Sequence, residues 1–228
     1  MCFRIVLFLF AHSLTGTPAR HSCAHCQPLT GLVDVQTLDP KILVELKYST
    51  TDNFVKQDVY GALTKAYLQP MAAQKLAKAS RWLQAHRPDL RLLVYDAARP
   101  KSAQVKLWNA LPQYTERQRR TYVADPREGS IHSYGCAVDL TLASADGSHG
   151  ETVPLDMGTP YDFFGPKAYP KLEAQMLKKG QLTAVQVANR RLLRQAMQAG
   201  GFMPIAYEWW HFNALSRQEA RRRFTVLE

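Results

Sequence analysis

Apolar and polar positions follow a period of two in several short stretches of the chain. Residues 43–48 (LVELKY) alternate in this way, as in a strand with one buried face. Residues 90–95 (LRLLVY) and 136–142 (CAVDLTL) are apolar runs of strand length. Two further strands are predicted near the C-terminus, over residues 202–205 and 207–212.

Other segments have the spacing of amphipathic helices. Residues 68–85 carry an apolar stripe, with Pro70 near the start of the helix. Residues 102–110 and 183–198 predict two more helices, the second closed by a Gly-Gly pair. Helices and strands do not alternate regularly. We therefore predict an α+β fold, a single domain with a mostly antiparallel central sheet flanked by helices.

Length and composition are those of one globular domain. The chain has 228 residues, of which 46% are hydrophobic and 21% charged, so a largely disordered chain is excluded.

Near the N-terminus, Arg4 precedes the apolar run 5–11, which is too short to span a bilayer. Small residues follow at Thr17 and Ala19, a pattern typical of a secretory signal.

We therefore expect a signal peptide over residues 1–19, a mobile segment over 20–27 and the folded domain over 28–228. The expected location is the periplasm or the outside of the cell. The alternative is a cytoplasmic protein with an over-extended translation start. Cys23 and Cys26 are compatible with a disulfide, a metal knuckle or no partner at all.

The chain is basic, with a formal net charge of +10. Part of the excess lies in two arginine clusters, Arg190–Arg194 and Arg221–Arg223. No zinc-finger, helix-turn-helix or RNP motif accompanies them, so nucleic-acid binding is not expected. We predict that these arginines lie on solvated helix faces. No segment predicts stable insertion in a membrane, and the sequence does not indicate an oligomeric state.

Two compact motifs carry candidate chemistry. In Ser130-Ile-His132-Ser-Tyr-Gly135-Cys-Ala-Val-Asp139, a His and an Asp flank a glycine that permits a tight turn. Imidazole and carboxylate are both zinc ligands, and a carboxylate within an apolar run needs a partner. The second motif, Glu208-Trp-Trp-His211, offers a third ligand and a carboxylate base. Glu and His three apart point to opposite faces of a flat strand, so this model requires a bend.

The SxHxxGxAxD motif followed by ExWH resembles the zinc D,D-peptidases, which include VanX-type dipeptidases and VanY-type carboxypeptidases. The resemblance extends over roughly residues 30–213. Residues 46–54, 95–100 and 208–211 resemble the dipeptidase branch in particular. The implied activity is zinc-dependent hydrolysis of the small dipeptide D-alanyl-D-alanine, with residues 28–228 as the catalytic domain.

The resemblance also implies roles for individual residues. One zinc ion per chain would be bound by His132, Asp139 and His211. Glu208 would be the general base, and Arg99 the cation that stabilises the oxyanion. Weaker candidates for substrate contacts are Ser130 and Tyr48, for the substrate ends, and Asp162, for the substrate ammonium.

Two alternatives remain open at this point. A D,D-carboxypeptidase of the same fold would use the same metal and chemistry on longer peptidoglycan peptides, in a more open groove. A zinc-bearing binding module without catalysis, of the kind found in hedgehog-type signalling domains, would share the fold. The presence of Glu208 and Arg99 argues against the binding module.

Overall fold

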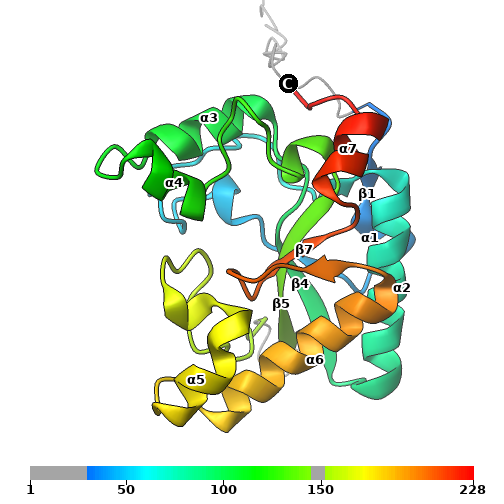
Figure 1. Cartoon of the computed structure of the whole chain (residues 1–228). Coiled ribbons are helices and arrows are strands. Elements are labelled where there is room, and N and C mark those ends of the chain that lie inside the picture. The colour runs from blue at the N-terminus through cyan, green and yellow to red at the C-terminus, as the bar shows by residue number, and fades with distance from the viewer. Residues whose placement is uncertain (1–29, 145–151) are drawn as a thin grey trace, which may run out of the picture.

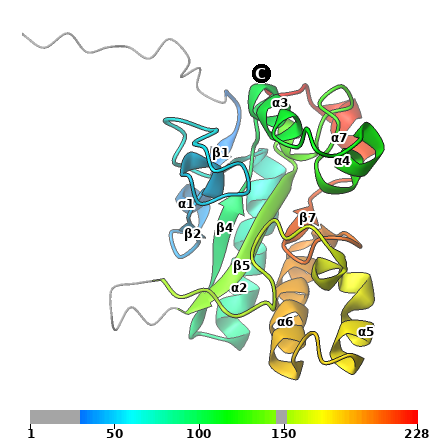
Figure 2. The same cartoon turned by 90° about the vertical axis from the view of Figure 1, so that its left-hand side faces the viewer.

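The computed structural model describes residues 30–144 and 152–228. Its main feature is a five-stranded sheet, shown in Figures 1 and 2. In spatial order its strands are β2 (Leu43–Val44), β4 (Leu90–Asp96), β5 (Ala137–Ser144), β7 (His211–Asn213) and β6 (Met203–Pro204). A second, two-stranded sheet joins β1 (Val33–Asp34) to β3 (Tyr67–Leu68).

The α+β prediction is confirmed, with one correction to the sheet. The pairs β4–β5, β5–β7 and β6–β7 are antiparallel. The edge strand β2 instead runs parallel to β4, so the sheet is mixed. The reason is the connection: between β2 and β4 the chain passes through β3 and a long helix, and such a crossover returns it in the same direction.

One face of the sheet is covered by the two long helices, α2 (Pro70–His86) and α6 (Ala184–Gly200). Alternate residues of β5, such as Val138 and Leu140, pack in the core cluster that includes side chains of both helices. Asp139 lies between them and faces the opposite side. The helices predicted at 68–85 and 183–198 are these two helices, and both are confirmed.

The other helices are shorter. They are α1 (Val35–Leu38), α3 (Lys101–Asn109), α4 (Glu116–Tyr122), α5 (Glu173–Lys178) and α7 (Arg217–Arg223). In Figure 1, α3 and α4 lie at the upper left and α5 at the lower left, away from α2 at the right. The functional site lies between α3 and α4 on one side and the segment that leads into α5 on the other.

Two strand predictions were too long. The strand predicted at 43–48 ends at Val44, and the chain continues into the 3-10 turn η1 (Lys47–Ser49). The strand predicted at 207–212 begins only at His211, because residues before it form bends. A short alternation of apolar and polar residues does not distinguish a strand from a turn that buries a single side chain. The turn η1, for example, buries Tyr48.

The interpretation of Arg190 as a solvated residue was wrong. Its side chain is completely buried, and it donates hydrogen bonds to the carbonyl oxygens of Met157 and Lys167. Arg194 pairs through both terminal nitrogens with Glu173. These arginines therefore fasten α6 to α5 and to the segment before it. The cluster Arg221–Arg223 is exposed, as expected.

The predicted signal peptide and the Cys23–Cys26 pair lie outside the described residues. Within the described parts of the chain, no helix is both long and apolar enough to cross a membrane.

Candidate metal centre and active site

His132 begins the 3-10 turn η2 (His132–Tyr134), which directly precedes β5. Gly135 ends this turn with a left-handed φ of 65°, and a Cβ there would lie 3.2 Å from Leu32 and 3.3 Å from the backbone nitrogen of Gln69. The Nδ1 atom of His132 lies 2.7 Å from the carbonyl oxygen of Ala97. A carbonyl oxygen only accepts, so Nδ1 carries the proton and Nε2 presents its lone pair to the site.

Asp139 and His211 are direct neighbours across the β5–β7 pair. The Nε2 atom of His211 lies 2.8 Å from Oδ1 of Asn213, which orients the ring. Nδ1 is thereby turned toward the site, 2.9 Å from Oδ1 of Asp139. The sheet register and a side-chain hydrogen bond together determine which nitrogen of His211 is available as a ligand.

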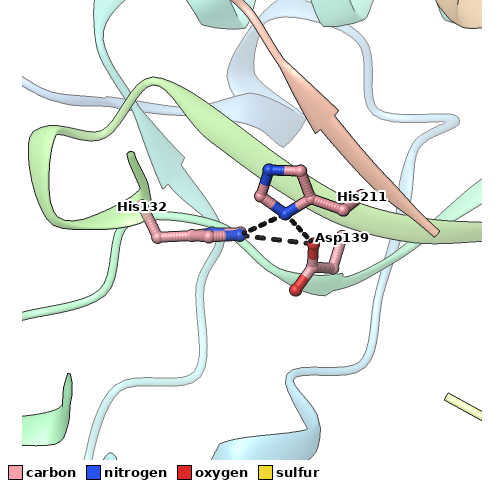
Figure 3. Close-up of side chains that lie close together, drawn as sticks. All are labelled: His132, Asp139 and His211. Atoms are coloured by element: carbon pink, nitrogen blue, oxygen red, sulfur yellow. Dashed lines mark hydrogen bonds and ion pairs between the residues drawn. The ribbon is translucent and has the colours of Figure 1, made fainter. Parts of the chain in front are cut away.

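The three donor atoms converge, as Figure 3 shows. Nε2 of His132 lies 3.2 Å from Oδ1 of Asp139 and 3.1 Å from Nδ1 of His211. Ligands of a tetrahedral zinc at about 2.0–2.1 Å lie about 3.3 Å from one another, so this donor set fits such an ion. Burial by itself raises the pKa of Asp139, but the two imidazoles outweigh it and hold that pKa well below its ordinary value.

Glu208 lies in the bend that precedes β7, as the chemistry of the motif requires. The bend brings its carboxylate to the same side as His211, with Oε2 3.8 Å from Nδ1 of His211. Burial raises the pKa of Glu208 to about 7, with Asp139 adding to the shift and His211 opposing it. A carboxyl group with such a pKa can accept and return a proton near neutral pH.

Arg99 follows β4 and is held by buried partners. Its guanidinium pairs through Nε and Nη2 with Oδ2 of Asp96, the Nε contact being 2.9 Å, and donates from Nη1 to Oε1 of Gln104 at 3.0 Å. Asp96 also accepts a hydrogen bond of 2.5 Å from Tyr60. Arg99 is only 7% exposed and faces the pocket.

Tyr48 and Asp162 meet from segments far apart in the chain. The Tyr48 hydroxyl donates to Oδ2 of Asp162 at 2.7 Å. Burial raises the pKa of Asp162 to about 8, while the Tyr48 hydrogen bond lowers it. The neighbouring Tyr161 donates to Oδ2 of Asp139 at 3.0 Å. Ser130 is buried, and its Oγ accepts a hydrogen bond of 3.3 Å from the backbone nitrogen of His132.

All eight residues singled out from the sequence line one pocket. They are Tyr48, Arg99, Ser130, His132, Asp139, Asp162, Glu208 and His211. The pocket has a volume of about 240 Å³. Pockets for drug-sized ligands measure roughly 300–1,000 Å³, so this one suits a smaller molecule.

Comparisons with known proteins agree with this geometry. Residues 29–227 match the peptidase M15 family described as D-ala-D-ala dipeptidase. The chain belongs to this family. It is 36% identical over 183 residues to the D-alanyl-D-alanine dipeptidase of Escherichia coli K12, an alignment that covers 80% of this chain and 84% of that protein. The dipeptidase of Enterococcus faecalis V583 is 31% identical over 188 residues, covering 75% of this chain and 85% of that protein.

Membership of the M15 dipeptidase family makes this chain a metal-dependent hydrolase of peptide bonds. The cluster His132, Asp139 and His211 is the group of ligand-type side chains that can hold a metal ion in the described residues. The alternative of a zinc-bearing module without catalysis is not supported by this membership.

The residues that hold the side chains of this M15 site in place were not predicted from the sequence. Asp96 and Tyr60 hold Arg99, Tyr161 contacts Asp139, and Asn213 orients His211. Tyr161 is adjacent to Asp162 and Asn213 lies two residues after His211, but no spacing rule marks either of them. Tyr60 and Tyr161 reach the site from other segments of the chain, whereas Asp96 and Asn213 contact residues three and two positions away.

Proposed function

We propose that this chain is a zinc-dependent dipeptidase that hydrolyses D-alanyl-D-alanine to two D-alanines. The observation that carries the proposal is the small pocket in which the three ligand side chains meet Glu208 and Arg99. Membership of the dipeptidase family supports the substrate. His132, Asp139 and His211 would hold one zinc ion.

Bound zinc supplies a Lewis acid that polarises the attacked carbonyl and lowers the pKa of water. Glu208 takes a proton from the attacking water and then gives it to the nitrogen of the leaving D-alanine, so that one water is consumed for each bond cleaved. The guanidinium of Arg99, fixed by Asp96, faces the negative charge that develops on the carbonyl oxygen.

The substrate ends are assigned to other side chains. Asp162 accepts hydrogen bonds from the substrate ammonium, with Tyr48 holding its carboxyl group in place. Ser130, which also lines the pocket, is a hydrogen-bonding group for the opposite end of the dipeptide. Positioning by groups that are already held reduces the ordering that substrate binding requires.

The proposal is tested by metal analysis and turnover on purified protein. We expect one zinc per chain and release of D-alanine from D-alanyl-D-alanine. His132→Ala should lose most bound metal and activity, because three protein ligands are the usual number for a catalytic zinc. His86→Ala is the matched control, since His86 is exposed and stacks on Trp82 away from the site.

Full metal content in His132→Ala would contradict the ligand assignment. A protein with one zinc that releases D-alanine only from longer peptides would be a D,D-carboxypeptidase instead.

A further inference from the structure

Three aromatic rings from separate segments form a continuous row at the pocket. Phe54 lies in the loop after η1, Tyr122 ends α4, and Phe164 lies in the segment before α5. The rings of Tyr122 and Phe164 are stacked, with centroids 4.5 Å apart and planes at 23°. Phe54 also meets Phe164 edge-on, with ring centroids 5.2 Å apart. We call Phe54, Phe164 and Tyr122 the aromatic row.

The aromatic row joins the two sides of the pocket. Phe54 and Tyr122 line the pocket directly. Phe164 contacts both rings and packs with the apolar cluster that includes Leu107 and Val123. A side chain from the segment before α5 thus reaches across to Tyr122 on the α3–α4 side and packs behind the pocket.

Asp162 connects the aromatic row to the proposed binding site of the substrate ammonium. It lies two residues before Phe164 and has a left-handed backbone with φ of 57°, a conformation that costs energy in a residue other than glycine. Asp162 is bonded to Tyr48, whose ring meets Phe54 edge-on at 6.2 Å. The group assigned to the substrate ammonium therefore lies beside the aromatic row, and one short turn of chain carries both.

We infer that the aromatic row restricts the enzyme to dipeptides by closing the pocket beyond the substrate ammonium. This inference rests on the proposed function. A substrate extended at its N-terminus replaces the ammonium with a neutral amide and directs another residue at the rings. To accommodate it, the stacked pair Tyr122–Phe164 must separate and expose apolar surface. Asp162 would at the same time lose its charged partner.

The test compares D-alanyl-D-alanine with glycyl-D-alanyl-D-alanine, which carries the smallest N-terminal extension. For each zinc-loaded protein the readout is the ratio of kcat/KM for the tripeptide to kcat/KM for the dipeptide. Phe164→Ala should raise this ratio about tenfold or more, within the range by which pocket size discriminates between substrates. Tyr122→Ala should act in the same direction, because it removes the other half of the stack.

Phe163→Ala is the matched control. Phe163 is the adjacent residue of the same type, but it is 38% exposed and is not part of the row. We expect its ratio to equal that of the parent enzyme. Phe164→Leu, which keeps apolar volume, serves as a second variant if Phe164→Ala does not fold, and should raise the ratio by a smaller factor.

The inference is overturned if the parent cleaves the tripeptide as efficiently as the dipeptide. It is also overturned if folded, zinc-loaded Phe164→Leu and Tyr122→Ala keep the parental ratio. A parent protein that cleaves neither peptide overturns the proposed function and the inference with it. The two failures can be told apart. If the parent prefers the dipeptide and the variants keep the parental ratio, only the role of the aromatic row is overturned.

Discussion

At the scale of single residues, the carboxylates in and behind the pocket differ in how their charge is balanced. Asp139 is surrounded by two imidazoles, which lower its pKa, and Asp96 is paired with Arg99. Burial instead raises the pKa of Glu208 to about 7 and that of Asp162 to about 8. The low pKa of Asp139 suits a metal ligand, which must be ionised, whereas the raised pKa values of Glu208 and Asp162 suit groups that exchange a proton or bind a cationic partner.

Glu208→Gln should retain zinc and fold but lose turnover. Gln is nearly the same size but cannot take a proton, and general base catalysis contributes about 10²–10⁴-fold, so we expect kcat to fall by at least about a hundredfold. Steady-state kinetics and metal analysis measure both quantities. Glu45→Gln, a change in a surface ion pair with Lys47, is the control. A fully metallated Glu208→Gln enzyme with parental kcat would remove Glu208 from the mechanism.

Asp162 should make substrate binding depend on pH. Only the ionised carboxyl attracts the substrate ammonium, and its pKa of about 8 lies above the ordinary value, so the ionised fraction grows as the pH rises from 6 to 8. The KM for D-alanyl-D-alanine should therefore fall over this range. Asp162→Asn should raise KM about 10- to 100-fold, because it removes a hydrogen bond to a charged group. The variant's KM should no longer depend on pH over this range. A KM profile identical in parent and variant would refute the ammonium assignment.

At the scale of elements, the sheet places three functional side chains in one row. Asp96 on β4 is opposite Asp139 on β5, which is opposite His211 on β7. The register of β4 shifts between Val94 and Asp96, so one extra residue is inserted there. This irregularity brings Asp96 opposite Asp139, although Val94, two residues earlier, packs in the helix-covered core. Bulges near active sites commonly redirect a side chain in this way.

The packing of α6 on α2 supports this sheet from its other face. At Gly200 an added Cβ would lie 2.6 Å from the carbonyl oxygen of Lys75 and 2.7 Å from the Cβ of Ala79. Gly200→Ala should therefore destabilise the fold by about 1–3 kcal/mol, the usual cost of overpacking. For a domain of this size that lowers Tm by roughly 2–12 °C. The kinetic constants at 25 °C should not change, since Gly200 does not line the pocket.

Thermal unfolding followed by circular dichroism measures this effect. Gln198→Ala, at an exposed position of the same helical turn, is the control and should shift Tm little. Equal Tm values for Gly200→Ala and the parent would show that the helices move apart at little cost.

At the scale of the whole molecule, the segment before α5 lies on one side of the pocket, and η1 and α4 lie on the other. Side-chain contacts join the two sides. The Tyr48–Asp162 hydrogen bond and the Tyr122–Phe164 stack both connect the segment before α5 to the opposite side. The family match begins at residue 29, close to the predicted start of the folded domain.

We propose that the chain is exported and that about the first 19 residues are removed. Leu9→Arg places a charge in the short apolar run and should leave the uncleaved chain in the cytoplasm, because a signal needs an uninterrupted apolar core. Cell fractionation and mass spectrometry of the N-terminus decide this. Leu9→Ile is the control. A parent protein that begins at Met1 in the cytoplasm would contradict export.

The sequence by itself determined the α+β class, the long helices and the motifs of the site. Each of these depends on residues close together in the chain. The helical stripe of 68–85 repeats within a few turns, and His132 and Asp139 are separated by one glycine-containing turn. The meeting of that motif with His211 was inferred from the family resemblance, since periodicity contains no information on pairing between distant strands.

Only the tertiary structure decided which residues support the site. His211 lies 72 residues after Asp139, and Tyr48 lies 114 residues before Asp162. Contacts at such separations depend on strand register and on how the loops pack. The same holds for Arg190, which donates to carbonyl groups of Met157 and Lys167 and lies 3.6 Å from the carboxylate of Glu173. A charged side chain looks solvated in sequence and is buried where the fold supplies hydrogen-bond acceptors and an opposite charge.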